Sequence, residues 1–147
     1  MSLSLIRDFL WIDERLGTSG RVLPEQLPWI AEAGFECVIN LLPEESDSWF
    51  PEEPGIVESL GLEFVCIPVI WRNPTTENLE AFYAALDMRQ GQKLFVHCAA
   101  NMRASAFIYL WRLRNGEDET EAAADLRDIW EPDGIWAEFI ATHKPRL

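Results

Sequence analysis

Apolar positions along this chain fall into short runs that are separated by turn residues. Residues 37–42 form an almost unbroken apolar run, and residues 93–97 contain a shorter one, in which Leu94, Phe95 and Val96 lie between Lys93 and His97. Such runs are typical of strands that are covered on both faces, and therefore of a parallel sheet. Residues 62–69 predict a further buried strand, and two short strands are expected earlier, at residues 9–12 and 16–19. The pattern as a whole predicts a sheet of about five strands.

Apolar residues at helical spacing predict helices between and after these strands. One helix is expected to follow Thr75 or Thr76, which would serve as its N-cap. The other expected helices cover residues 24–34, 56–60, 102–115, 119–130 and 133–143. Strands that alternate with helices imply right-handed crossovers between parallel strands. We therefore expect a single α/β domain over residues 1–147, with a mainly parallel central sheet and helices on both faces.

Acidic residues outnumber basic residues in this composition. The 147 residues include 12 Lys and Arg against 25 Asp and Glu, which gives a formal net charge of −13. Nucleic acids and anionic membranes attract basic surfaces, so this charge argues against both as partners. No apolar run approaches the length of a bilayer span, and the first residues lack the features of a secretory signal.

The chain has three cysteines and two histidines. An odd number of cysteines, with Cys37 and Cys66 in strand-like runs, fits a reducing cytoplasm better than a disulfide framework. We interpret these two cysteines as core residues. The histidines, cysteines and acids show no metal-ligand spacing, so neither a metal nor another cofactor is expected.

The third cysteine, Cys98, lies where a buried strand passes directly into a helix. Backbone N–H groups and the positive end of the helix dipole meet at such a junction, where they bind anions and stabilise a thiolate. Arg103 adds a planar, charged group that suits phosphate. Asn101 tolerates the positive φ of a tight loop. An isolated cysteine is more often a core residue, but this combination favours an anion-binding loop.

The residues from Val96 to Ala100, followed by Arg103 and Ser105, resemble the signature of the cysteine-dependent tyrosine and dual-specificity phosphatases. More narrowly, the chain resembles a small bacterial phosphatase-like group that is associated with β-lactamase-like hydrolases. The segments Thr18-Ser19-Gly20 and Ile67-Pro68-Val69 share this resemblance, which covers about 120 residues, from 9 to 130. It implies a dual-specificity-phosphatase-like fold.

The resemblance also implies a two-step mechanism. Cys98 would attack phosphorus as a thiolate, the loop amides and an arginine would hold the phosphate oxygens, and water would hydrolyse the phosphocysteine. Ser105 would stabilise the departing thiolate, and an aspartate on a neighbouring loop would protonate the leaving oxygen. His97 would brace the loop by hydrogen bonding, with its side chain directed away from Cys98. The residues expected to bind phosphate are Ala99, Ala100, Asn101, Met102, Ala104 and Arg72.

The loop departs from the family pattern in its spacing. The family places five residues between cysteine and arginine, but only four separate Cys98 from Arg103. In one alignment no residue is missing and Ala104 takes the arginine position. Arg103 then points about 100° around the helix from that position, and it holds phosphate only if its flexible guanidinium reaches back. In the other, the loop is one residue short and Arg103 keeps its role. We prefer the first alignment, because it preserves Ser105 and needs no deletion.

The general acid is the second departure. The loop after Ile67-Pro68-Val69 should carry it, but this loop reads Ile70-Trp71-Arg72-Asn73 and has no carboxylate. Arg72 would instead add positive charge to the anion site, and Trp71 and Trp49 would line the pocket or pack. The nearest acids are interpreted as solvated loop residues; they are Glu44, Glu45, Asp47 and Glu77.

Three functions are compatible with the sequence. The first is a weak or specialised phosphatase that hydrolyses phosphate monoesters on Cys98. The second is an inactive domain that binds phosphate or a phosphopeptide. The third is a rhodanese-like sulfurtransferase, because rhodanese loops also place four residues between the cysteine and a basic residue. The expected partner is a phosphorylated protein or a small phosphate ester, and the sequence indicates neither substrate identity nor oligomeric state.

Overall fold

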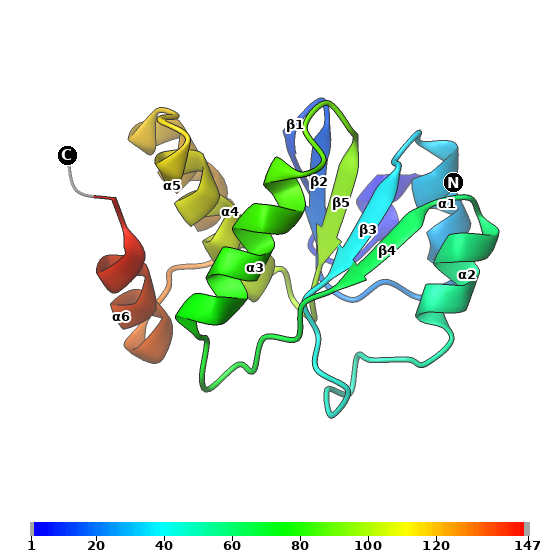
Figure 1. Cartoon of the computed structure of the whole chain (residues 1–147), viewed down its shortest axis with the longest axis horizontal. Helices are drawn as coiled ribbons and strands as arrows, with labels where there is room; N and C mark the ends of the chain where they lie inside the picture. The colour runs from blue at the N-terminus through cyan, green and yellow to red at the C-terminus, as the bar shows by residue number, and fades with distance from the viewer. Residues whose placement is uncertain (1, 146–147) are drawn as a thin grey trace.

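The computed structural model describes residues 2–145 (Figure 1). The ends of the predicted domain, residues 1, 146 and 147, lie outside the described residues. Five strands form one sheet in the order β1-β2-β5-β3-β4. β1 pairs with β2 in the antiparallel direction, and the remaining neighbours are parallel. The α/β fold with a mainly parallel sheet is therefore confirmed.

The strands are short, and all have four residues. Their bounds are β1 Leu10–Asp13, β2 Leu16–Ser19, β3 Cys37–Asn40, β4 Glu63–Cys66 and β5 Leu94–His97. The α-helices are α1 Leu27–Glu32, α2 Glu53–Ser59, α3 Thr76–Asp87, α4 Met102–Arg114, α5 Glu119–Ile129 and α6 Gly134–His143. Two 3-10 helices, η1 Leu3–Leu5 and η2 Pro24–Gln26, complete the described elements.

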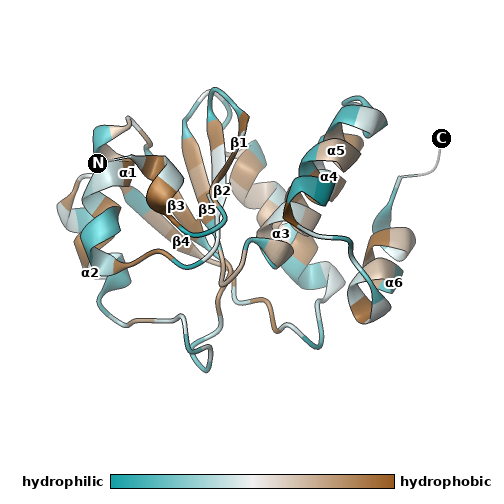
Figure 2. Ribbon diagram, turned by 180° about the vertical axis from the view of Figure 1, so that it is seen from behind, coloured by the Kyte–Doolittle hydropathy of each residue, from teal (hydrophilic) through white to brown (hydrophobic). Residues whose placement is uncertain are grey.

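Helices cover both faces of the sheet. Alternate residues of a strand point to opposite faces, so Val38 and Phe95 pack with α1 and α2. Cys37, Ile39 and Val96 pack on the other face, with the residues of α3 to α6. Figure 1 shows α1 and α2 on one side of the sheet and the larger helical layer on the other. The central strands are coloured as hydrophobic in Figure 2, as expected for strands buried on both faces.

The loops that matter for function leave one edge of the sheet. β2, β5, β3 and β4 run parallel, so their carboxyl ends meet at that edge. The loops after β3 and β4 both emerge there (Figure 1), and the segment from Cys98 to Asn101 joins β5 to α4 at the same edge. Ligands of open α/β sheets bind at such an edge.

The prediction of a buried strand at residues 62–69 is wrong in both length and burial. β4 ends at Cys66 and pairs only with β3, so it is an edge strand with half-exposed or exposed residues. Cys66 is exposed, and its prediction as a core residue is wrong, whereas Cys37 is buried. Cys66 pairs with Asn40, three residues along β3 from Cys37. The two thiols therefore lie roughly 10 Å apart along the strands and on opposite faces, too far for a disulfide.

Candidate functional site

Cys98 lies at the floor of a small pocket at the carboxyl edge of the sheet. Its backbone continues β5, because its N–H donates to the Ser19 carbonyl at 3.3 Å. Only 1% of the residue is exposed, yet Cys98 lines a cavity of about 160 Å³. This volume accommodates several water molecules, and therefore a phosphate-sized group. The other lining residues are Trp71, Ala99, Ala100, Met102 and Arg103.

Backbone donors of this loop are free for a ligand. Within residues 2–145, the N–H groups of Ala99, Ala100, Met102 and Arg103 donate to no acceptor. α4 begins at Met102, and its first turn carries no acidic residue that would neutralise the positive end of its dipole. Unpaired N–H groups in a loop that precedes a helix form an anion-binding concavity.

Two neighbouring segments hold the loop in place. Gly20 packs against it so closely that a Cβ atom would lie 2.8 Å from the Ala99 carbonyl oxygen, and that oxygen accepts from the Arg21 N–H at 2.9 Å. Asn101 adopts φ 62°, in the left-handed region. Its side-chain amide donates to the Asp8 carbonyl and to the Thr18 hydroxyl, at 2.9 and 3.0 Å. The loop geometry is therefore fixed before any ligand binds.

Arg103 faces the cavity that Cys98 lines. Its guanidinium donates to the Val69 carbonyl at 2.9 Å, and its Cζ lies 5.8 Å from the centroid of the Trp71 ring. The side chain of Ala104 instead lies in the hydrophobic core. This arrangement favours the alignment with the shorter loop, in which Arg103 keeps the arginine position. In the preferred alignment Arg103 reaches the site only if its guanidinium extends back from a displaced position, and Ala104, in the arginine position, would offer the cavity no polar group.

Ser105 is separated from the pocket. Its hydroxyl donates to the Met102 carbonyl at 3.1 Å, a bond within the first turn of α4, and Ser105 does not line the cavity that contains Cys98. Four of the predicted site residues next to Cys98 therefore line the cavity, and they are Ala99, Ala100, Met102 and Arg103. The side chains of Asn101, Ala104 and Ser105 support the loop from outside the cavity.

His97 belongs to a buried polar network on the other face of the sheet. Its Nε2 lies 2.6 Å from the Glu53 carboxylate, and the Asn40 side-chain amide donates to the same carboxylate at 3.0 Å. All three residues are buried. Asn40 also accepts from the Leu42 N–H at 2.7 Å. The network thus joins β5, β3 and α2 directly behind Cys98.

Sequence reasoning misses Glu53, because the segment from Pro43 to Glu53 has the composition of a polar loop. The helix predicted at residues 56–60 in fact begins at Glu53, and Pro54 occupies its first turn. A glutamate before a proline is typical of an exposed helix start. The pairing of β3 with β5 places Asn40 beside His97, and the packing of α2 brings the Glu53 carboxylate to both.

Trp71 forms one wall of the pocket and is anchored by the C-terminal part of the chain. The Trp136 indole N–H of α6 donates to the Trp71 carbonyl at 2.8 Å. The Trp71 ring stacks on Trp136 and contacts Trp130, with 5.5 Å between centroids in both pairs. Trp49 packs against the core and lines neither of the pockets that Trp71 lines. The aromatic cluster therefore fixes the loop after β4.

A second cavity of about 260 Å³ adjoins the Cys98 cavity, because Trp71 and Arg103 line both. Arg72 lies in this second cavity, on the exposed turn that the Asn73 N–H closes to the Ile70 carbonyl. The loop after β3 supplies the other wall, which includes Glu45. Arg72 is therefore next to the anion loop but not within it.

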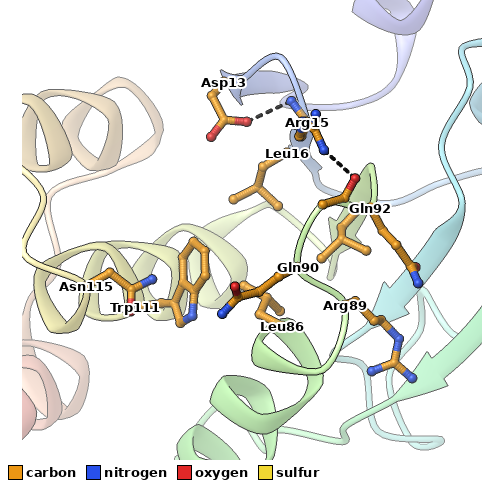
Figure 3. A pocket seen from close by; sticks show the side chains of 11 residues that line it. Asp13, Arg15, Leu16, Leu86, Arg89, Gln90, Gln92, Trp111 and Asn115 are labelled. Carbon is orange, nitrogen blue, oxygen red and sulfur yellow. Dashed lines mark hydrogen bonds between the residues drawn. The ribbon is translucent and has the colours of Figure 1, made fainter.

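A third cavity of about 370 Å³ lies at the opposite, amino edge of the sheet (Figure 3). Leu16 and Leu94, the first residues of β2 and β5, form part of its lining. Its cations already have partners: Arg15 donates to the Gly91 carbonyl, and Arg89 forms two hydrogen bonds with Glu63. The described residues that line it include no thiol, hydroxyl or imidazole group.

The structure shows no metal centre among residues 2–145, since no group of three His, Cys, Asp or Glu side chains is arranged to hold an ion. No helix in this part of the chain is long and apolar enough to cross a membrane. Burial raises the pKa of the Cys37 thiol to about 11, so Cys37 is neutral at pH 7. Partial desolvation of the exposed Cys66, together with the negative charges of Glu53 and Glu44, also raises the pKa of its thiol.

A family model described as "DSP-PTPase phosphatase fused to NAD+ Kinase" matches residues 13–135. Two proteins from strains of Xylella fastidiosa, both described as "Beta-lactamase hydrolase-like protein", are 31% identical to this chain over 146 residues. The match covers 92% of this chain and 33% of each relative. The chain therefore spans about a third of the length of these relatives.

Solved structures share the fold, and two of them show different degrees of similarity. A DUF442 protein from Shewanella putrefaciens CN-32 is 34% identical, with a TM-score of 0.86, and the match covers 96% of this chain and 93% of that chain. Tk-PTP in the active form is 21% identical, with a TM-score of 0.79, and the match covers 95% of this chain and 98% of that chain. At this lower identity the likeness to Tk-PTP shows the fold alone.

Proposed function

Because this chain belongs to the DSP-PTPase family of cysteine-dependent phosphatases, as its loop residues predicted, we propose that it hydrolyses phosphate monoesters through a cysteinyl phosphate on Cys98. The observation that carries the proposal is the shared cavity of Cys98 and Arg103. A nucleophile and an oxyanion-binding cation must face the same reacting phosphate, and these two residues line one phosphate-sized space.

The loop supplies the remaining binding groups. The free N–H groups of Ala99, Ala100, Met102 and Arg103 are directed to no acceptor in the described chain and would hold the non-bridging phosphate oxygens. The dipole of α4 favours negative charge at the same point, both on the phosphate and on the Cys98 sulfur. Because the loop is already fixed by Gly20 and Asn101, little reorganisation accompanies binding.

The reaction has two steps. The Cys98 thiolate attacks phosphorus, a sulfur–phosphorus bond forms, and the leaving oxygen departs with the electron pair of the broken phosphorus–oxygen bond, to be protonated to the alcohol. Water then attacks the phosphocysteine, inorganic phosphate departs, and the thiolate is restored. Arg103 stabilises the charge on the equatorial oxygens in both steps. Its bond to the Val69 carbonyl orients the guanidinium without neutralising it.

His97 acts as a positioning residue. Its ring is directed to Glu53 on the opposite face of the sheet and has no access to the cavity. The buried bonds between His97, Glu53 and Asn40 fix the end of β5, and they thereby fix the backbone from which Cys98 projects. Arg72, in the adjoining cavity, contributes positive charge to the approach of the substrate.

The proposal is tested by hydrolysis of p-nitrophenyl phosphate, whose good leaving group needs little protonation. The wild-type protein should turn it over, vanadate should inhibit it, and Cys98→Ser should lose activity by at least about a thousandfold, because an alcohol is a far weaker nucleophile than a thiolate. Cys66→Ser is the matched control, since Cys66 is an exposed cysteine outside the cavity. Equal activity of Cys98→Ser and wild type would disprove the mechanism.

A phosphate-binding domain without turnover is the second candidate, because the loop after β4 offers Ile70, Trp71 and Arg72 where the family places an acid. This candidate predicts that phosphate binds and stabilises the protein while no substrate is hydrolysed. Thermal unfolding with and without phosphate, combined with the hydrolysis assay, distinguishes the two functions. The four-residue loop also fits a sulfurtransferase, which would form a persulfide on Cys98 with thiosulfate.

The substrate that fits this proposal is a phosphorylated protein or a small phosphate ester. Among the described residues, Arg72 and Arg103 are the two arginines that line the paired cavities, and the formal net charge of the chain is −13. Both features favour a substrate with a single phosphate over a highly anionic one. A thiolate nucleophile needs a reducing compartment, so we assign the activity to the cytoplasm.

A further inference from the structure

The loop after β4 carries no acid, so the leaving oxygen of a substrate must find its proton elsewhere. Eleven described residues line the two adjoining cavities, and Glu45 is the only carboxylate among them. Building on the proposed function, we propose that Glu45 is the general acid. It is supplied by the loop after β3 rather than by the loop after β4.

The position of Glu45 is fixed from both sides. It is the third residue of the turn in which the Ser46 N–H donates to the Pro43 carbonyl at 3.0 Å. After the turn, the N–H of Ser48 donates to the Ser46 hydroxyl at 3.2 Å, and that of Trp49 donates to the Ser46 carbonyl at 3.0 Å. Because Pro43 is buried and Trp49 packs against the core, the turn is anchored to the body of the protein.

The direction of the reaction matches this placement. In an in-line displacement the leaving oxygen lies opposite the attacking sulfur. Cys98 occupies the first cavity, so the leaving group extends out of it, past Arg103 and Trp71, into the second cavity where Glu45 lies. Within residues 2–145 the Glu45 carboxylate forms no ion pair, and its side chain is exposed. It is therefore free to meet a substrate.

Glu45 donates a proton in the first step and regains one in the second. As the Cys98 sulfur bonds to phosphorus, the phosphorus–oxygen bond breaks and the Glu45 carboxyl gives its proton to the departing oxygen, which leaves as the alcohol. The Glu45 carboxylate then accepts a proton from the water that attacks the phosphocysteine. The sulfur–phosphorus bond breaks, the thiolate returns, and both residues regain their starting states.

Two acids of the same loop provide a comparison. Glu44 and Asp47 are exposed neighbours of Glu45, but neither lines either cavity. All three look alike in the sequence, as solvated loop acids. In the structure only Glu45 of these three acids lines the second cavity, together with Arg103.

The test uses two aryl phosphates of similar size, p-nitrophenyl phosphate and phenyl phosphate, because phenolate is the poorer leaving group. Glu45→Gln should lower kcat/KM for phenyl phosphate by about a hundredfold, while the change for p-nitrophenyl phosphate stays within about threefold. Glu44→Gln should match wild type on both substrates.

The outcomes separate the two proposals. If Glu45→Gln keeps the wild-type ratio between the two substrates, Glu45 is not the acid, although Cys98-dependent turnover stands. If wild type hydrolyses neither ester, the phosphatase function fails, and the role of Glu45 fails with it. If Glu44→Gln shows the same selective loss, the effect belongs to the charge of the loop and not to the position of Glu45.

Discussion

Strand β5 and helix α4 contribute to one pocket at the amino edge of the sheet and to another at its carboxyl edge. The two pockets differ in whether their hydrogen-bond donors already have protein acceptors. Leu94 and Trp111 line the amino-edge cavity, where Arg15 is already bonded to a backbone carbonyl (Figure 3). Arg89 in the same cavity is bonded to Glu63. Cys98, roughly 13 Å from Leu94 along the strand, lies beside backbone donors that have no acceptor. The amino-edge cavity is the larger of the two.

The contrast shows that volume does not identify a functional site in this fold. An unpaired donor beside a cavity carries a cost of desolvation, unless a ligand or water satisfies it. The direction of α4 adds to the difference, because its positive end faces the cavity of Cys98 and its negative end faces the amino-edge cavity. The carboxyl edge is therefore prepared for an anion, and the amino edge is not.

The largest expected effect is the difference in activity between variants of Arg103, at the carboxyl edge of the sheet, and Arg89, at the amino edge. Arg103→Ala should lower kcat/KM for p-nitrophenyl phosphate by about a hundred- to a thousandfold, since a fixed oxyanion donor is lost. Arg89→Ala, at the amino edge, should leave kcat/KM within about twofold of wild type, because Arg89 lines neither of the cavities beside Cys98. Steady-state kinetics of both variants measure the contrast.

A stability control belongs with this pair, because Arg103 also bonds to Val69. Arg103→Lys keeps the charge but loses the planar fork, so it should remain folded and recover only part of the activity. Equal losses in Arg103→Ala and Arg89→Ala would remove the functional distinction between the two ends.

The next largest effect is a loss of folding stability when the buried network of His97, Glu53 and Asn40 is broken. Glu53→Ala leaves the buried polar groups of His97 and Asn40 without their acceptor, so the free energy of unfolding should fall by about 3–5 kcal/mol. Glu63→Ala removes a largely exposed carboxylate from its pair with Arg89, and should cost less than about 1 kcal/mol. Urea unfolding of the two variants gives both values. Similar values for both would show that the buried network adds nothing beyond a surface pair.

The smallest effect is a pH dependence at the amino end. The hydrogen bonds from Arg89 lower the pKa of Glu63 below its ordinary value of 4.5. The pair therefore stabilises the fold above pH 4.5, and this contribution is lost as the pH falls through the lowered pKa. Glu63→Gln should be less stable than wild type by under about 1 kcal/mol at pH 7, and the difference should shrink below pH 4.5. A difference that does not change with pH would contradict this explanation.

The sequence predicted the architecture because its strongest signals are local. The apolar run at Leu94–His97 and the helix that follows are visible in the hydrophobic pattern. The strand at residues 62–69 was overextended, because an apolar run does not show that β4 is an edge strand or that Ile67 and Val69 are buried beyond the end of the sheet. Edge position depends on the order of the strands, which the pattern of one strand cannot contain.

The candidate site was predictable only in part, for the same reason. Cys98 and Arg103 lie close together in the sequence, so their association was visible as a motif. Glu53 and Trp136 reach the site region from distant elements, and they look like an exposed helix start and an ordinary core residue. Glu45 cannot be distinguished from Glu44 without the turn that orients it. Contacts between distant segments carried the missing information.

The most direct test of the central claim is a search for the phosphocysteine itself. Mixing the protein with excess p-nitrophenyl phosphate, followed by an acid quench and peptide mass spectrometry, should reveal one phosphoryl group on the peptide that contains Cys98. The adduct should be absent from Cys98→Ser. Turnover by a protein whose quenched Cys98 peptide never carries phosphate would contradict covalent catalysis at this loop.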